Sequence, residues 1–163
     1  FVGASALVPV PEPFDIVITS NSGYPLDLNL YQAVKGMSAA AQVVRRGGSI
    51  IVAAECWDGL PRHGEYARLL RLAATPQELL AAIEGLDPPR QDQWQVQVQA
   101  QILMKADVYV KNSYLDALTL EQAMVRPCAS IEETVAGLLR RYGPKATICV
   151  LPEGPMTIPY PSR

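Results

Sequence analysis

Residues 15–55, DIVITSNSGYPLDLNLYQAVKGMSAAAQVVRRGGSIIVAAE, decide the fold because they read as strand, helix and strand in succession. The segment 15–20 is a β-branched run bounded by Pro13 and by the turn residues NSGYP, which is typical of a buried strand. Residues 49–55, SIIVAAE, predict a second buried strand. A helix fits between them, so we expect a right-handed βαβ unit with parallel strands.

The helix predicted between these strands, from about Leu28 to Val44, has two faces of opposite character. Apolar residues recur at helical spacing and should pack on the sheet. They are Leu30, Ala33, Val34, Met37, Ala41 and Val44. We expect Asp27 to cap the start of this helix, and the run RRGG to end it with Gly47 in the left-handed C-cap.

The rest of the chain continues the alternation of helices and strands. We predict helices at 66–73, 75–85 and 92–105, helices starting near Thr119 and Ser130, strands at 106–112 and 146–154, and an extended proline-rich tail. Residues 92–105 also alternate like a strand, but their length and composition favour a helix. The pattern predicts a single α/β domain, with a mostly parallel sheet of four or more strands covered by helices.

The composition argues against several classes of protein. The 163 residues suffice for one core, and the net charge of −2 leaves no basic footprint for nucleic acid. No run of about 18 apolar residues is present, so we expect no membrane partner. The start, FVGASALVPVPEPFD, has no initiator Met and no charged region of a signal peptide. We expect it to follow a cut inside a longer chain.

Common motifs for thiol, phosphate and dinucleotide chemistry are missing. Cys56, Cys128 and Cys149 are odd in number and widely spaced, so we expect reduced, mostly buried thiols in a cytoplasmic protein. Neither a G-x-x-x-x-G-K-[ST] loop nor a G-x-G-x-x-G run follows a strand, which argues against a dinucleotide-binding domain.

The single histidine, His63, shares a loop with Asp58 and Glu65. Three potential ligands in one loop are more often solvated side chains than a metal site. We therefore predict no metal site in this chain.

Three polar residues of the helix, Tyr31, Gln32 and Lys35, fall within one arc of about 100° that lies opposite the apolar face. A lysine ammonium, an amide and a phenol hydroxyl can together hold a small carboxylate. The alternative is an ordinary solvated helix face. The preceding residues Asn21, Ser22 and Gly23 follow the first strand, where open α/β sheets place ligands, and this favours a binding role.

Three segments of the sequence resemble a known family. The long stretch TSNSGYPLDLNLYQAVKGM, with DQWQVQ at 92–97 and LPEGPMTIP at 151–159, is similar to the carboxyl-terminal domain of the nickel-dependent lactate racemases. The resemblance implies a two-domain isomerase whose absent N-terminal domain carries a nickel-pincer nucleotide and the catalytic histidines. The cofactor would take a hydride from a 2-hydroxy acid and return it to the opposite face.

The resemblance further implies that this chain, residues 1–163, is the substrate-side domain and closes the cleft between the two domains. Lys35 would pair with the substrate carboxylate, Gln32 would hydrogen-bond nearby, and Tyr31 would line the same wall. Trp94 would cover the cleft, although plain core packing is an equal alternative. No catalytic residue, metal ligand or bound cofactor is expected in this fragment.

A domain that has lost its partner keeps its former interface. We therefore expect an apolar or aromatic patch beside the helix that carries Lys35. The alternative function is a stand-alone α/β ligand-binding or interaction module without catalytic activity.

Overall fold

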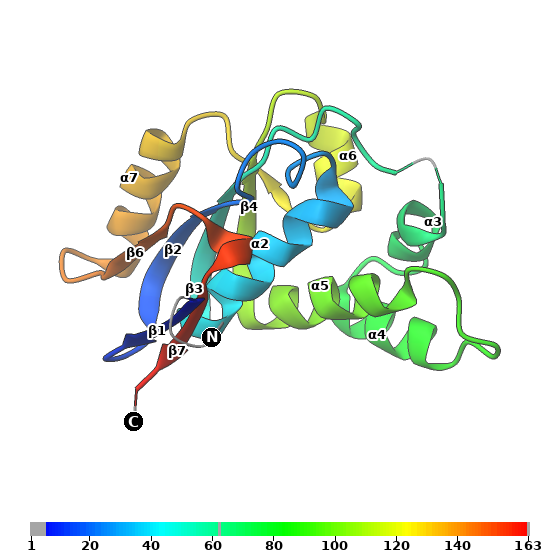
Figure 1. The fold of residues 1–163 in the computed structure, drawn as a ribbon, viewed down its shortest axis with the longest axis horizontal. Helices are drawn as coiled ribbons and strands as arrows, with labels where there is room; N and C mark the ends of the chain where they lie inside the picture. Colours follow the sequence, from blue (N-terminus) through cyan, green and yellow to red (C-terminus); the bar gives the residue numbers. More distant parts are fainter. Residues whose placement is uncertain (1–5, 62, 163) are drawn as a thin grey trace.

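A computed structural model describes residues 6–61 and 63–162, and a five-stranded, wholly parallel sheet lies at its centre (Figure 1). Its strands are β2 (Phe14–Ser20), β3 (Val44–Ala53), β4 (Ala106–Lys111), β5 (Arg126–Pro127) and β6 (Ile148–Leu151), in the spatial order β5-β4-β3-β2-β6. A separate parallel ribbon pairs β1 (Leu7–Val10) with β7 (Ile158–Pro161). The predicted single α/β domain with a parallel sheet is confirmed.

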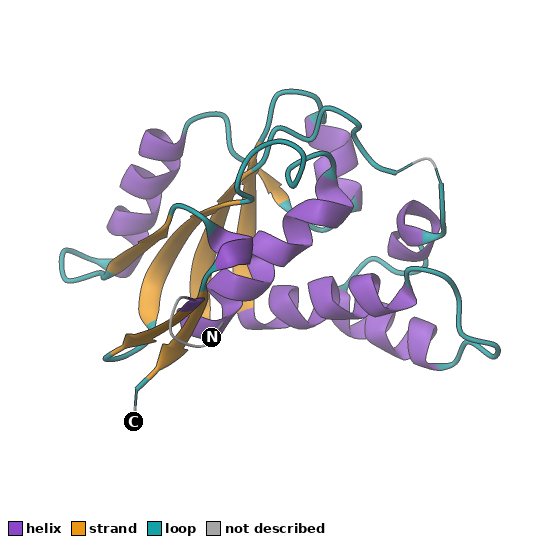
Figure 2. Cartoon of the chain, in the orientation of Figure 1, coloured by secondary structure: helices purple, strands orange, loops and turns teal. Residues whose placement is uncertain are grey.

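Helices cover both faces of this sheet, as Figure 2 shows. They are α2 (Leu30–Val43), α3 (Tyr66–Leu70), α4 (Pro76–Glu84), α5 (Gln93–Lys105), α6 (Ala117–Gln122) and α7 (Ile131–Tyr142), followed by the short 3₁₀ turn η1 (Gly154–Met156). The ambiguous segment 92–105 forms α5, so its prediction as a helix is confirmed. No helix in the described part of the chain is both long and apolar enough to cross a membrane.

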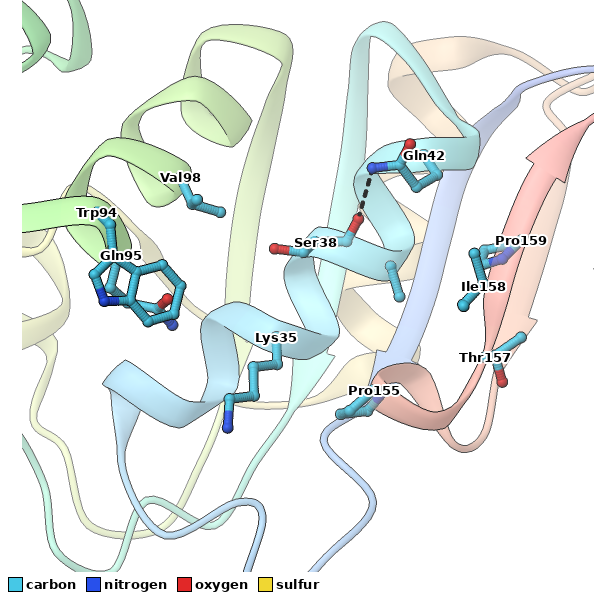
Figure 3. Close-up of a pocket in the computed structure, with 11 residues that line it drawn as sticks. Lys35, Ser38, Gln42, Trp94, Gln95, Val98, Pro155, Thr157, Ile158 and Pro159 are labelled. Carbon is cyan, nitrogen blue, oxygen red and sulfur yellow. Dashed lines mark hydrogen bonds between the residues drawn. The ribbon is translucent and has the colours of Figure 1, made fainter. Parts of the chain in front are cut away.

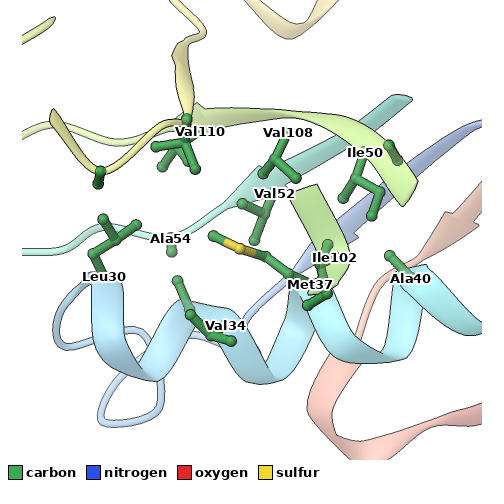
Figure 4. Packing of buried hydrophobic residues seen from close by; sticks show 14 of the residues in the cluster. Leu30, Val34, Met37, Ala40, Ile50, Val52, Ala54, Ile102, Val108 and Val110 are labelled. Carbon is green, nitrogen blue, oxygen red and sulfur yellow. The ribbon is translucent and has the colours of Figure 1, made fainter. Parts of the chain in front are cut away.

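Alternation along the strands divides the core into two layers. Ile16 and Ile51 face α7, whereas Val17, Ile50 and Val52 face the side covered by α2. On that second side α2 buries its apolar face, except that Ala41 is only half-buried (Figure 4). The α2 residues that are shielded from solvent are Leu30, Ala33, Val34, Met37, Ala40 and Val43. This packing determines which side of α2 faces away from the sheet.

The two ends of α2 differ from the prediction. Asn29, not Asp27, caps the helix, because the Asn29 side chain accepts the backbone N–H of Gln32 at 3.1 Å. Asp27 is held elsewhere, since its carboxylate accepts the backbone N–H of Glu55 at 3.2 Å. The expected C-cap at Gly47 is also wrong. The helix ends at Val43 and β3 begins at once, so Gly47 takes its positive φ inside the strand.

Three further boundaries move for tertiary reasons. Asp116 caps α6 in place of Thr119, whose backbone N–H it accepts at 2.7 Å. The strand predicted at 146–154 is limited to β6, where it pairs with β2. The tail is extended as predicted, but it is also paired, with Leu7 opposite Ile158 in the ribbon. The predicted N-caps at Thr75 and Ser130 are confirmed.

Candidate functional site

The outward side of α2 forms the floor of an open groove of about 400 Å³ (Figure 3). The floor of the groove consists of Lys35, Ser38, Ala39 and Gln42 of α2. One wall belongs to α5 and contains Trp94, Gln95 and Val98. The opposite wall belongs to η1, β7 and the residue between them, and contains Pro155, Thr157, Ile158 and Pro159. We call this feature the α2 groove. It brings together Lys35, which the helical pattern singled out, and Trp94, which the family resemblance implied.

Lys35 is the one charged side chain among the described residues that line the α2 groove. It is exposed, and it forms no ion pair or hydrogen bond within the described part of the chain. The sequence of α2 explains this, because no acidic residue occurs along the helix to pair with a lysine one turn away. An unpaired ammonium between apolar walls is well suited to bind an anion.

Trp94 stands at the rim of the α2 groove with 57% of its surface exposed. Its ring contacts Tyr31 edge-on at a centroid distance of 6.2 Å, and Tyr31 contacts buried Tyr66 in the same way at 5.3 Å. Trp94 is therefore held by an aromatic chain and is not part of the core. Ile158 on the opposite wall is also exposed, so apolar side chains border the groove beside α2.

Tyr31 and Gln32 lie on the turn of α2 before Lys35, and they do not line the α2 groove itself. Both are half-buried, and neither side chain forms a hydrogen bond within the described residues. Burial, reinforced by the negative charge of Asp92, raises the pKa of Tyr31, so its hydroxyl stays protonated and able to donate. Of the three residues of the expected polar arc, Lys35 is exposed, Gln32 is half-buried, and Tyr31 packs against the core and against Trp94 of α5.

Two hydrogen bonds hold α5 beside α2. The buried Gln95 amide donates to the carbonyl of Tyr31 at 2.6 Å, and Lys105 donates to the carbonyl of Ala41 at 2.5 Å. Both pairs have the same sequence separation, so the two helices lie side by side in a fixed register. This arrangement places Trp94 next to the site, which its spacing in the sequence could not indicate.

The opposite wall depends on two glycines. Gly154 of η1 lies so close to Gly36 of α2 that a Cβ on Gly154 would come within 3.3 Å of the Gly36 Cα. Such a Cβ would also come within 2.5 Å of the Ser20 carbonyl oxygen. The Ser20 hydroxyl donates to the Pro152 carbonyl and ties the same loop to the end of β2. Only a residue without a side chain fits here, so Gly154 sets how closely Pro155 approaches α2.

A second, more polar hollow of about 260 Å³ lies at the carboxyl ends of β2, β3 and β4. Its lining residues are Ser20, Gly23, Asp27, Ala53, Ala54, Glu55, Lys111, Asn112 and Ser113. One oxygen of Asp27 is buried here without a hydrogen-bond partner in the described residues. Asn21, which follows β2 at this edge, does not expose its polar groups. It is fully buried, and its Oδ1 accepts the N–H of Gly36 at 2.9 Å.

The three cysteines are unpaired thiols, with Cys56 and Cys128 buried and Cys149 half-buried. Burial, reinforced by the carboxylates of Asp27 and Glu55, raises the pKa of Cys56 to about 12. A thiol with so high a pKa is a poor nucleophile near neutral pH. Cys56 is therefore a structural residue.

The described residues do not form a metal site. In the ranges 6–61 and 63–162, no three His, Cys, Asp or Glu side chains cluster closely enough to hold an ion. His63 is exposed in its loop, away from any such group. The described residues thus offer no cluster of donors that would hold a nickel ion.

Comparison with known proteins agrees with the fold. A family described as the lactate racemase C-terminal domain matches residues 10–158. A lactate racemase from Thermoanaerobacterium thermosaccharolyticum is 37% identical over 145 residues, covering 88% of this chain and 34% of the relative. A lactate racemase from Lactiplantibacillus plantarum is 35% identical over 144 residues, covering 86% and 33%.

Solved structures also match the fold of this chain. The lactate racemase apoprotein from Thermoanaerobacterium thermosaccharolyticum superposes with a TM-score of 0.88 at 34% identity, covering 98% of this chain and 38% of that one. A Thermotoga maritima protein has a TM-score of 0.62 at 10% identity over 96% of this chain and 39% of its own, which shows a shared fold only. The chain thus spans about a third of the length of the curated relatives that it matches.

Proposed function

Because the chain belongs to the lactate racemase C-terminal domain family, we propose that it is the substrate-side domain of a 2-hydroxy-acid racemase or epimerase. In this proposal the remaining two thirds of the enzyme precede it in the same polypeptide and carry a nickel-pincer nucleotide. That cofactor would supply the hydride transfer. The protein would act in the cytoplasm, where its three thiols stay reduced.

The observation that carries the proposal is the unpaired Lys35 ammonium between the two walls of the α2 groove. In the proposed role it binds the substrate carboxylate. Trp94 and Pro155 would exclude water on either side, which strengthens an ion pair by lowering the local dielectric. Gln32, one turn earlier, would hydrogen-bond the 2-hydroxyl or the carboxylate, and the protonated Tyr31 hydroxyl would donate to the same ligand.

In this proposal, this chain and the rest of the enzyme have different roles in the reaction. The residues of this chain would bind and orient the acid and close the site, while proton and hydride transfer belong to the other domain. On its own the chain is therefore expected to fold without racemising lactate.

The test uses the cofactor-loaded full-length enzyme that contains this chain. Lys35→Ala should lower kcat/KM by about 30- to 1000-fold, which corresponds to roughly 2–4 kcal/mol for a lost charge-assisted contact in a closed site. Lys145→Ala, which removes an exposed lysine in the loop before β6, is the matched control and should leave kcat/KM unchanged. Cofactor content is measured in each variant. Wild-type kinetics in Lys35→Ala would rule out the carboxylate-binding role.

A further inference from the structure

The α2 groove continues well beyond the lysine that would hold the carboxylate. Its floor runs from Lys35 through Ser38 and Ala39 to Gln42, a distance of roughly 10 Å along the helix at about 1.5 Å per residue. Its volume of about 400 Å³ falls within the range of sites that hold small organic ligands, about 300–1,000 Å³. A three-carbon acid bound at Lys35 would leave most of this length empty.

Apart from Lys35, each polar side chain that lines the groove donates at least one hydrogen bond within the chain. The Ser38 hydroxyl donates to the Val34 carbonyl at 2.9 Å, and Gln42 donates to the Ser38 carbonyl at 3.4 Å. On the walls, Gln95 donates to the backbone of α2 and Thr157 donates to the Glu153 carbonyl at 3.0 Å. Apart from Lys35, the groove therefore offers a ligand mostly apolar contact.

The two walls present apolar side chains that face each other across α2 (Figure 3). Val98 extends from α5 on one side, and Ile158 stands on β7 on the other, with 48% of its surface exposed. Burying apolar surface between such walls stabilises a complex by about 25 cal/mol per Å². A ligand with one anionic end and an apolar body matches this arrangement better than a uniformly polar one.

We propose that the substrate of this site is a 2-hydroxy acid whose C3 carries a larger apolar group than a hydrogen, either branched aliphatic or aromatic. This proposal rests on the proposed function. The carboxylate binds Lys35, and the apolar group lies over Ser38 and Ala39 between Val98 and Ile158. These two wall residues then determine specificity, although neither takes part in the reaction.

The experiment measures ligand binding to the isotope-labelled chain by NMR, with the Trp94 indole as the reporter. Lactate and 3-phenyllactate are titrated separately to high concentration. We expect 3-phenyllactate to bind at least about tenfold more tightly, since its ring fills the apolar part of the groove. In Ile158→Asp this preference should fall to near onefold. Val150→Asp, a matched change of an exposed apolar residue on β6, should retain it.

A second variant guards against misfolding of the first. Val98→Asp places the charge on the other wall and should abolish the same preference, with amide spectra confirming an intact fold in both variants. Equal affinity for the two acids, or a preference that survives both wall variants, would overturn the proposal. If both acids bind equally but lose affinity in Lys35→Ala, only this inference fails. If neither acid binds, this inference also fails. If both acids bind but Lys35→Ala changes neither affinity, the carboxylate-binding role in the proposed function fails.

Discussion

The two faces of α2 have opposite roles, although they belong to a single 14-residue helix. The inner face is fully buried against β2, β3 and β4 and has no polar side chain. The outer face carries the unpaired Lys35 and forms the floor of the α2 groove. Under the proposed function, stability resides on one side of the helix and ligand recognition on the other, so substitutions should affect one property without the other.

The largest expected effect is on the inner face. Met37 is completely buried at the centre of the cluster in Figure 4, so Met37→Ala should lower the free energy of unfolding by about 3 kcal/mol through lost burial and a residual cavity. Chemical denaturation measures the change. Gln42→Ala on the exposed side of the same helix is the control and should stay within about 0.5 kcal/mol. A loss below about 1 kcal/mol for Met37→Ala would contradict the assignment of the faces.

The next effect concerns the side of α2 that packs against η1. Gly154→Ala should destabilise the protein by about 1–3 kcal/mol, because its new methyl group would overlap the Thr19 hydroxyl and the backbone of β2. Gly137→Ala on α7 is the matched control, since its Cβ would meet nothing closer than 3.7 Å. That control should be neutral or stabilising by up to about 1 kcal/mol. Destabilisation of equal size in both variants would refute the close packing.

A smaller, pH-dependent effect on the free energy of unfolding is expected just beyond the C-terminal end of α2, where Asp15 of β2 pairs with Arg45 of β3. The backbone N–H of Thr147 and the Arg45 guanidinium lower the pKa of Asp15 below its usual value of 3.8. A lowered folded-state pKa stabilises the protein above the unfolded-state pKa, and this contribution is lost as the pH falls through the folded-state value.

Wild-type protein should therefore lose stability more steeply than Asp15→Asn as the pH falls from about 5 to about 3. Denaturation at a series of pH values measures both slopes. Glu84→Gln, which changes an exposed carboxylate on α4, should leave the wild-type slope unchanged. Parallel slopes for wild type and Asp15→Asn would exclude the role of Asp15.

The smallest effect on stability is expected on the outer face. Lys35 is exposed and unpaired in the described residues, so Lys35→Ala should change the free energy of unfolding by less than about 0.5 kcal/mol. The same denaturation experiment checks this value. A larger loss would mean that Lys35 supports the fold, and the contrast between the two faces of α2 would no longer hold.

Local patterns were sufficient to predict the strand, helix and strand of residues 15–55, since helix and strand periodicity are both encoded in neighbouring residues. The choice between Asp27 and Asn29 as N-cap was not local. Both are good capping residues. The Asp27 carboxylate instead accepts a hydrogen bond from the backbone N–H of Glu55, which follows β3. Likewise, RRGG resembled a helix stop, but the chain entered β3 without one.

Local patterns predicted Lys35 on the outer side of α2 but not the walls of the groove, of which only Trp94 was expected, through the family resemblance. Lys35 follows from helical periodicity alone. Trp94 reaches the site only because α5 is bonded to α2, and Ile158 only because the tail pairs with residues about 150 positions earlier. Such long-range pairings leave no periodic signal. The glycine in LPEGP was the one local hint that its segment approaches another backbone closely.

The central claim is that Lys35 binds the carboxylate of a 2-hydroxy acid, and one titration tests it directly. NMR signals of the Lys35 side chain are followed while lactate, or the uncharged lactamide of the same shape, is added to the chain. We predict that lactate shifts the Lys35 signals in a saturable manner, that lactamide leaves them unchanged, and that salt weakens the effect of lactate. Equal shifts with both compounds, or shifts at Lys145 but not at Lys35, would contradict the claim.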